Sequence, residues 1–486
     1  MDAASLQIPL VEHTNECSTS RCVYFVRTFG LESKKLWRIT GPAIMNRVAM
    51  YGVPVITQAF VGQIGDLELA AISMIINVIW GFNFGLLLGL GSALQTLCGQ
   101  AFGAQQYTML GIYLQRSWIV VTSFAVIVLP VYIFASPILK LLGQADDIAE
   151  LTGKVAIWCI PMHFSLVLWW TTTWYLQAQL KNMVIAYTAS VALILHVLMS
   201  WVFTVKLGWG LAGAVASMNF AWCWPSVTLF FYIICGGCPL TWKGFSLDAF
   251  SQLWSYLKLS VSSGIMLSVE IWYMRLILLL TFKLQNLEVA DDSLSICMTI
   301  NGWEFMIPIA FLVGTSVRVS NELGAGNGKA AKFSAVVSAT TSLVIGIVIF
   351  VLLIIFRNSF ASLFTQSATI QQAVSKLALL LAFTILLNSV QPVLSGVAIG
   401  TGKQYIIAYV NVISYFVIGV PLGAILGYLF HLDVMGIWTG MLCGTAVQTA
   451  AIMFIVFRSD WKREAIIATS RVKTWSSSHR RREEQP

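Results

Sequence analysis

The stretch that decides the fold is KLSVSSGIMLSVEIWYMRLILLLTF, residues 258–282, followed after a short acidic loop by SLSICMTINGWEFMIPIAFLVGTSV, residues 293–317. Each segment is long and apolar enough to cross a bilayer as a helix. Glu270 lies near the middle of the first and Glu304 near the middle of the second. An ionised carboxylate is costly at that depth, so it usually faces a cavity or a partner. No other Asp or Glu lies inside an apolar span, and these two are therefore the first candidates for a functional site.

The composition of the whole chain agrees with this interpretation. Of its 486 residues, 58% are hydrophobic and 10% charged, whereas about 25% of residues are charged in a typical soluble domain. In lipid the backbone polar groups are satisfied only within helices or closed barrels. We therefore expect an all-α polytopic membrane protein. The net charge of +8 lies in short loops and the tail, where it sets orientation, so we expect no nucleic-acid partner.

Twelve apolar spans predict twelve transmembrane helices in two six-helix lobes. The expected organisation is a cytosolic arm (1–33), a first lobe (34–235), a cytosolic linker (236–252), a second lobe (253–457) and a cytosolic tail (458–486). The arm is polar and is expected to be irregular. The spans lie at roughly 37–60, 69–96, 114–136, 151–176, 184–206, 210–235, 253–282, 293–318, 333–356, 371–399, 404–429 and 434–457.

Basic and acidic residues occupy opposite sets of loops. The positive-inside rule places the Lys- and Arg-rich set in the cytosol. Both termini fall in that set, as an even number of helices requires. The basic set includes Arg27, Lys34, Lys35, Arg38, Arg116, Lys181, Lys243, Lys329, Lys332 and Lys403, and the acidic set includes Asp66, Glu68, Asp146, Asp147, Glu150, Glu288, Asp291, Asp292 and Asp433.

The two halves of the chain resemble each other. LELA at 67–70 returns as LEVA at 287–290, and SALQTLCGQAFGA at 92–104 parallels TSVRVSNELGAGN at 315–327. The offsets stay between 220 and 223 residues, and such a nearly constant register across several segments indicates duplication. Because each half has an even number of helices, the repeats are parallel, an arrangement found in secondary transporters with the substrate site between the halves.

No ATP-binding loop of the GxxxxGK[ST] type occurs in the chain. Transport work would then come from an ion gradient. A carboxyl group in apolar surroundings holds its proton more tightly than in water, so Glu270 and Glu304 are candidates for proton exchange. The alternative is a static ion pair or hydrogen-bonded network. Arg275, five residues after Glu270, would pair with it only obliquely on a helix, or with another helix.

Further polar residues cluster on the predicted helices of the second half. An aromatic, partly polar ligand would suit Tyr273, Asn301, Trp303, Asn388 and Gln391, although many Trp residues lie in interfacial belts. Arg47 is the only other charge deep in a span. Its side chain either attracts anionic substrate groups or extends to the membrane surface, and the sequence favours neither alternative.

Several segments resemble signature blocks of plant multidrug and toxic compound extrusion (MATE) transporters of the detoxification type. The resemblance covers nearly all of residues 34–475. It implies a V-shaped fold of twelve helices in two lobes, and export of organic compounds in exchange for cations, usually protons in plants. The blocks are VITQAFVGQIGDLELAAIS, SALQTLCGQAFGA, YLQRSW, SICMTINGWEFM, SVRVSNELGAGNGKAAKF and LLNSVQPVLSGVAIGTG.

The resemblance also assigns roles by position. Glu270 matches the family's Glu in helix 7, which is implicated in proton coupling. Asn388 stands where some plant branches have Asp, so Glu304 becomes the more plausible second group. Gln63 replaces a common His and Gln95 a usual Glu, which leaves the spans of the first lobe without an acid.

Together these observations predict a secondary antiporter that exports small organic compounds, such as flavonoids, alkaloids or xenobiotics, from the cytosol in exchange for protons. The expected partners are the solute, the proton and the lipid bilayer, with a functional monomer and no cofactor or metal. The expected location is the tonoplast or the plasma membrane. The alternative is a passive anion channel or facilitator of the same fold. An enzyme is disfavoured because the sequence shows no metal-ligand cluster or nucleophile–base arrangement.

Overall fold

The computed structural model describes residues 18–281 and 287–483, and it shows helices and no strand within them. The first half comprises α1 (Ser18–Val61), α2 (Asp66–Met74), η2 (Ile75–Ile79), α3 (Trp80–Gly103), α4 (Tyr107–Val128), α5 (Pro130–Ile133), α6 (Ala135–Leu141), α7 (Asp146–Trp158), α8 (Ile160–Ala178), α9 (Asn182–Ser200), η3 (Trp201–Lys206), α10 (Gly210–Tyr232), η4 (Ile233–Gly237) and η5 (Leu247–Phe250). The second comprises α11 (Leu253–Thr281), α12 (Leu287–Gly324), α13 (Gly328–Phe356), η6 (Phe360–Leu363), α14 (Ala368–Asn388), α15 (Gln391–Thr401), α16 (Gln404–Val412), η7 (Ile413–Gly419), α17 (Val420–Ala424), η8 (Ile425–Leu429), α18 (Asp433–Arg458) and α19 (Trp461–Glu483).

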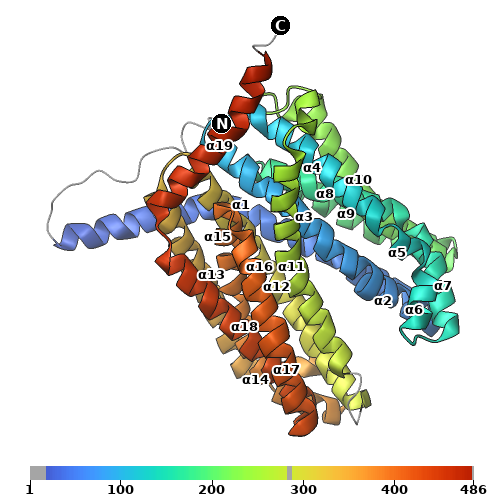
Figure 1. The fold of residues 1–486 in the computed structure, drawn as a ribbon. Coiled ribbons are helices and arrows are strands. Elements are labelled where there is room, and N and C mark those ends of the chain that lie inside the picture. The colour runs from blue at the N-terminus through green and yellow to red at the C-terminus, as the bar shows by residue number, and fades with distance from the viewer. Residues whose placement is uncertain (1–17, 282–286, 484–486) are drawn as a thin grey trace.

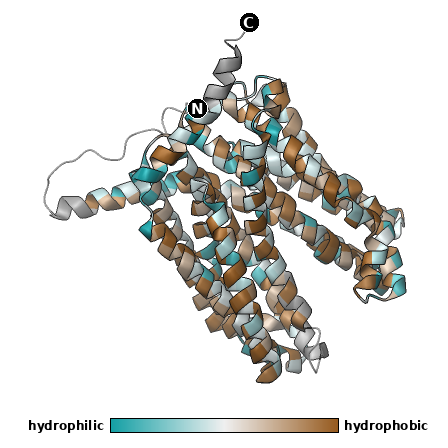
Figure 2. Cartoon of the chain, viewed as in Figure 1, coloured by the Kyte–Doolittle hydropathy of each residue, from teal (hydrophilic) through white to brown (hydrophobic). Residues whose placement is uncertain are grey.

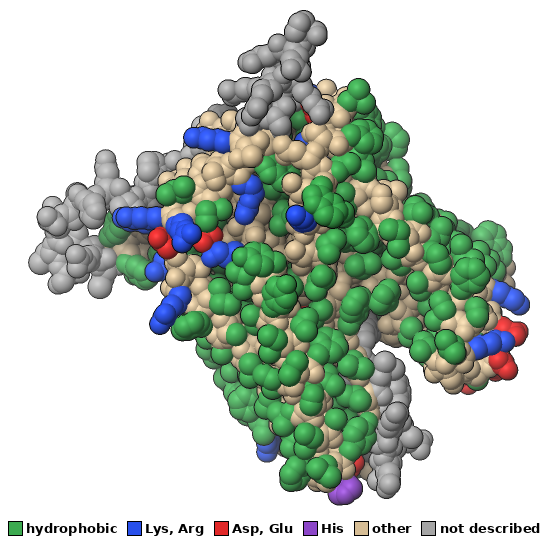
Figure 3. Space-filling model, in the orientation of Figure 1, with side chains coloured by type: hydrophobic (Ala, Val, Ile, Leu, Met, Phe, Trp, Pro, Cys, Tyr) green, Lys and Arg blue, Asp and Glu red, His purple; other side chains and the backbone are tan. Residues whose placement is uncertain are grey.

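The helices form two arms that diverge from a common end (Figure 1). The first arm contains α2 to α10 and the second contains α11 to α18. We call the end where α3, α12, α15 and α19 meet the apex, and the opposite end the open end. The space-filling view shows the hollow between the arms widening away from the apex (Figure 3). A V-shaped cleft thus separates the two repeats.

The outer surface of the arms is apolar, as a lipid-facing surface must be (Figures 2 and 3). On α13, exposed side chains include Val344, Val348, Val351 and Ile355. Nine helices of the described residues are long and apolar enough to cross a membrane, and the bent pair α7 and α8 makes a tenth. Helices α1 and α11, with 44 and 29 residues, meet the length requirement but are not among the ten. The polytopic all-α fold is confirmed, while the count of twelve stays a prediction.

Glycines let α3 and α12 pack backbone to backbone at the apex. A Cβ on Gly103 would collide with the backbone of Asn321, and one on Gly324 would collide with the backbone of Gln100. The two contacts are related by the repeat: Gly324 lies 221 residues after Gly103, and Asn321 lies 221 residues after Gln100. The seam is therefore pseudosymmetric, as parallel repeats require, and it consists of the two segments whose sequences resemble each other.

The expectation of an irregular polar arm before residue 34 is wrong for its described part. Helix α1 begins at Ser18 and continues through the first span, while residues 1–17 lie outside the described chain. Glu32 anchors this part of α1. Its buried carboxylate accepts hydrogen bonds from Arg318 on α12, at 2.7 Å from Nε and 3.1 Å from Nη2. This buried ion pair holds α1 against the second arm about four turns after the helix begins.

The basic tail forms α19, which lies across the apex and contacts both arms. Its buried side chains are Trp461, Ala465, Ala468 and Val472, spaced three or four residues apart as on one face of a helix. Lys403, just after α15, pairs with Glu464 at 2.7 Å.

Arg471 extends the contacts of α19 to the first arm. Its Nη1 donates to the Gln100 side-chain oxygen on α3 at 3.0 Å and lies 3.5 Å from the carbonyl oxygen of Thr401 at the end of α15. The ring of Trp475 packs edge-on against Tyr113 of α4. Helix α19 thus joins the two arms at their common end.

The connection between the arms is held by the YLQRSW segment of α4. The Gln115 side chain donates to the carbonyl of Gly244 at 3.0 Å and accepts from the backbone N–H of Ser246 at 2.8 Å. Arg116 donates to the carbonyl of Asp248 at 3.1 Å and to the Ser251 hydroxyl at 2.8 Å. This signature segment therefore has a structural role, which is to dock the linker onto the first arm.

Candidate functional site

A helix break in the second arm organises the candidate site. Helix α14 ends at Asn388 and α15 begins at Gln391, with Pro392 in its first turn. Proline has no N–H to donate and is well tolerated at this position. The Ser342 hydroxyl of α13 donates to the freed carbonyl of Ser389 at 2.6 Å. The start of α15 lies within the candidate membrane span Ala368–Thr401, and the positive end of a helix dipole favours negative charge beside it.

Glu270 on α11 lies beside this break. Its carboxylate faces the side-chain amide of Gln391, its hydrogen-bond partner, and that amide also lies 3.3 Å from the Ser395 hydroxyl. Tyr415 of η7 is close enough for the charge of Glu270 to act on its phenol group. Glu270 is only partly buried. A carboxylate is therefore held at a helix start with one amide and one phenol near it.

Tyr273 lies in a slot one turn further along α11. Its ring stacks on Tyr415 with 4.3 Å between centroids and 11° between planes, and its hydroxyl donates to the Met441 carbonyl at 3.2 Å. The slot exists because Gly419 and Gly444 lack side chains where the hydroxyl lies. Tyr273 is fully buried, so in this conformation it supports Tyr415 and does not line the cleft.

Two asparagines join α12 to the end of α14. The Asn388 amide donates to the Asn301 side-chain oxygen at 3.2 Å. Glu304, one turn after Asn301, is 8% exposed, and its Oε2 has no hydrogen-bond partner within the described residues. No ion pair links the two predicted acids to any described residue. The side chain of Arg275 lies outside the described part of the chain.

Trp303 and Arg47 belong to the boundary between the arms. Trp303 is 37% exposed and packs edge-on against Tyr51 of α1, with 5.0 Å between ring centroids. Arg47, one turn before Tyr51, lies over the rings of Trp170 and Trp174 of α8 in the first arm, at 5.1 and 5.9 Å. The structure therefore brings Glu270 and Gln391 together and joins Asn301 to Asn388, but it places Arg47 in the other arm.

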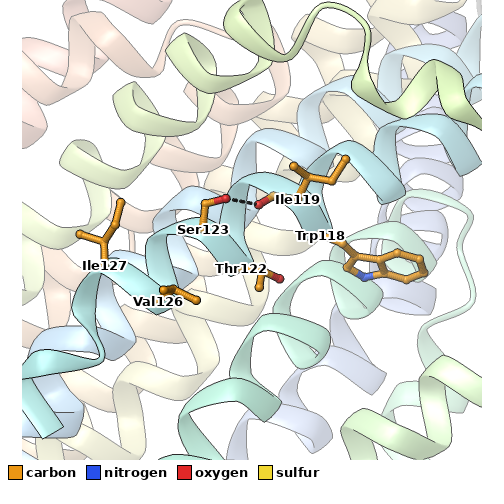
Figure 4. Close-up of a pocket in the computed structure, with 6 residues that line it drawn as sticks. All are labelled: Trp118, Ile119, Thr122, Ser123, Val126 and Ile127. Carbon is orange, nitrogen blue, oxygen red and sulfur yellow. Dashed lines mark hydrogen bonds between the residues drawn. The ribbon is translucent and has the colours of Figure 1, made fainter. Parts of the chain in front are cut away.

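A pocket on α4 is separate from this site. Trp118, Ile119, Thr122, Ser123, Val126 and Ile127 line it, and all six come from one helix (Figure 4). The Ser123 hydroxyl donates to the Ile119 carbonyl at 2.8 Å and is thus satisfied within the helix. Val126 and Ile127 are exposed. The pocket is a groove on the outer apolar surface. Among the described residues, no group of three or more His, Cys, Asp or Glu side chains is placed to hold a metal.

Sequence reasoning missed two parts of this arrangement. The partners of Arg47 come from α8, more than 120 residues away along the chain, and no local signal indicates them. The proximity of Tyr415 to Glu270 likewise depends on how α11 packs against η7. The break at residues 389–390, by contrast, has a signal in Pro392.

Two repeated arms, a cleft between them and a carboxylate at an interrupted helix are features of a helical membrane carrier. The comparisons with known proteins agree. The MatE family profile matches residues 42–202 and 262–425, and the chain belongs to the MatE family of membrane transporters.

Similar proteins cover almost the whole chain. Protein DETOXIFICATION 27 of Arabidopsis thaliana is 57% identical over 92% of this chain and 92% of its own length. Protein DETOXIFICATION 28 of the same plant is 52% identical over 93% and 92%. The crystal structure of the eukaryotic MATE transporter AtDTX14 matches with a TM-score of 0.87 at 30% identity, covering 91% of this chain and 99% of that one. The Vibrio cholerae MATE transporter VcmN in the bent form, at 16% identity and a TM-score of 0.78 over 90% of this chain and 99% of that one, shares the fold.

Proposed function

We propose that this transporter is a proton-coupled antiporter that exports small organic compounds, of the flavonoid, alkaloid or xenobiotic kind, from the cytosol. The observation that supports this most is Glu270, a carboxylate in the second arm that faces Gln391 at the start of α15 and lies near Tyr415. A carboxyl group in this setting changes its hydrogen bonding when it gains a proton, because a neutral carboxylic acid donates where the carboxylate only accepted.

The charge distribution supports an orientation with the apex in the cytosol. Exposed Lys and Arg side chains gather around the apex, whereas acidic and basic side chains lie together at the tip of the first arm (Figure 3), where Lys140 pairs with Asp146 and Glu150. Under the positive-inside rule, both termini are cytosolic and the cleft opens away from the cytosol. The proposed location is the tonoplast or the plasma membrane, and the proposed functional unit is a monomer.

The proposed cycle uses the break between α14 and α15. A proton from the outer side neutralises Glu270 and weakens its attraction to the start of α15. The Gln391 amide then exchanges partners, and the second arm rearranges and displaces the solute into the cleft. Deprotonation toward the cytosol restores the first state. Glu304, enclosed and without a partner for Oε2 among the described residues, is the proposed second proton-binding group.

Transport by purified protein in proteoliposomes tests this proposal. A panel of organic compounds is screened for uptake into liposomes with an acidic interior, with and without collapse of the pH gradient. We expect gradient-driven uptake by the wild type and loss of it in Glu270→Gln. Glu150→Gln, which changes an exposed acid, is the matched control and should transport normally. Uptake that ignores the pH gradient would instead favour a passive facilitator.

A further inference from the structure

Arg47 on α1 is a buried cation that packs against the first arm and has no counter-ion among the described residues. Arg47 is 8% exposed, and no hydrogen bond or ion pair to it forms within the described residues. Its Nε is fully enclosed without a partner, whereas its terminal Nη atoms are not enclosed in this way. The apolar spans of this arm contain no Asp or Glu. A buried charge without a partner is costly. The burial of Arg47 therefore needs an explanation other than an ion pair within the protein.

The groups around Arg47 are hydrogen-bond donors. The indole rings of Trp170 and Trp174 lie beneath its guanidinium, and the two rings are nearly parallel, with 26° between planes and 6.2 Å between centroids. Both indole Nε1 atoms are buried without a partner in the described residues. Guanidinium and indole groups donate hydrogen bonds and accept none. The cluster therefore offers positive charge at the edge of the guanidinium, which is held over two enclosed indoles whose N–H groups have no partner among the described residues.

We infer that Arg47, Trp170 and Trp174 form a binding subsite for the anionic end of an aromatic solute, meaning a carboxylate or phenolate attached to a planar ring. The anion supplies the missing acceptor and counter-charge at the guanidinium, and its ring lies outside the enclosed indoles, toward the partly exposed Trp303. This inference rests on the proposed export of organic solutes, and it names the class of solute that the first arm accepts.

The position of the cluster fits this role. Tyr51 follows Arg47 by one helical turn and contacts Trp303 and Gly302 of the second arm. Trp303 is itself partly exposed, and the cluster lies one turn from this contact with the second arm. Anion binding in the first arm and proton binding at Glu270 in the second place the two ligands in different repeats. Rearrangement of one arm relative to the other is then the event that couples them.

The extension of Arg47 to the membrane surface, considered from the sequence, does not fit this geometry. Its guanidinium lies over two rings that are each 1% exposed, inside the arm. The remaining alternative is that the cation–π contacts only hold α1 against α8. Such contacts contribute about 0.5–2 kcal/mol each, and a purely structural role predicts that no anion binds.

Equilibrium binding of radiolabelled benzoate to purified full-length protein separates these roles. We expect saturable binding of the labelled benzoate. Unlabelled benzoate should displace it better than benzamide, its neutral analogue, and better than acetate, which lacks the ring. Arg47→Gln should weaken binding at least about tenfold, because charge-assisted hydrogen bonds are lost. Arg47→Lys should keep part of it, because the charge remains but the flat guanidinium does not. Trp174→Phe should reduce binding and retain the preference for the anion.

Glu270→Gln and Arg357→Gln are the controls, and both should bind benzoate normally. Since the assay uses no gradient, failure of proton coupling leaves its result unchanged, and loss of benzoate binding leaves the Glu270 transport test unchanged. If Arg47→Gln does not fold, Arg47→Lys and Trp174→Phe carry the test. Equal affinity of wild type and these variants for benzoate, or equal affinity of the wild type for benzoate and benzamide, would overturn the inference.

Discussion

The side chains of Asn388 and Asn301 are linked by an N–H···O bond of 3.2 Å, which ties the end of α14 to α12 beside the helix break. Both groups are amides, so this link needs no proton to form. Loss of either amide leaves the other without its partner in a partly buried position. We expect Asn388→Ala to lower the free energy of unfolding by about 1–2 kcal/mol, measured by thermal unfolding in detergent.

A double-mutant cycle measures how much of the stability contributed by each amide comes from its bond to the other. If most of it does, Asn388→Ala combined with Asn301→Ala should be little less stable than either single variant. Strictly additive losses would show that the bond contributes nothing of its own.

The glycine seam at the apex predicts strong effects of small substitutions. Gly103→Ala and Gly324→Ala each place a methyl group against the opposing backbone, which cannot move aside as a side chain can. We expect both variants to lose the monodisperse folded state or to unfold many degrees earlier. Gly30→Ala in α1 is the matched control, because nothing lies within 4 Å of its added Cβ and no proline follows it. That change should stabilise the helix by about 0.5–1 kcal/mol.

Replacing the two members of the buried pair, Glu32 and Arg318, should cost different amounts of stability. Arg318 also pairs with Glu322 at 2.6 Å, so Glu32→Gln leaves the arginine with one carboxylate. Arg318→Gln takes the arginine from both acids and leaves Glu32 only Lys35, at 4.0 Å, so it should destabilise the protein more, by about 3 kcal/mol. Thermal unfolding of the two variants at one pH and salt concentration compares them, and a more stable Arg318→Gln would contradict this account.

The contacts of the tail helix α19 are expected to stabilise the apex. Arg471 contacts α3 and the end of α15 together, so Arg471→Ala should loosen both arms at this end. We expect faster hydrogen exchange in the last turns of α3 and α12, with the middle of α13 unchanged. Lys473→Ala, two residues along on an exposed position, is the control for changes in tail charge. Unchanged exchange at the apex in Arg471→Ala would show that α19 is not a structural tie.

The sequence predicted the parts of the molecule that depend on local patterns. Apolar runs predicted the helical spans, and two similar segments predicted the repeat whose glycines form the seam. The helix of the tail was missed, although Trp461, Ala465, Ala468 and Val472 carry a helical spacing, because the tail is polar overall.

What the sequence did not predict depends on contacts between distant segments. Glu32 lies in a polar stretch, and only the packing of α1 against α12 buries it beside Arg318. The rings under Arg47 belong to α8, and the pairing requires that α1 cross from the second arm into the first. The roles of Glu270 and Glu304 in proton binding stay predictions, and the structure contributes the neighbours that make each of them testable.

Proton movement measured together with solute movement tests the central claim most directly. A pH-sensitive dye sealed inside proteoliposomes reports the interior pH while a transported solute enters down its own gradient, with no pH gradient imposed. For the wild type we expect the interior to become more alkaline as solute enters, because protons leave in exchange, and we expect Glu270→Gln to abolish that change. Solute-driven proton exit of equal size in Glu270→Gln would contradict the account.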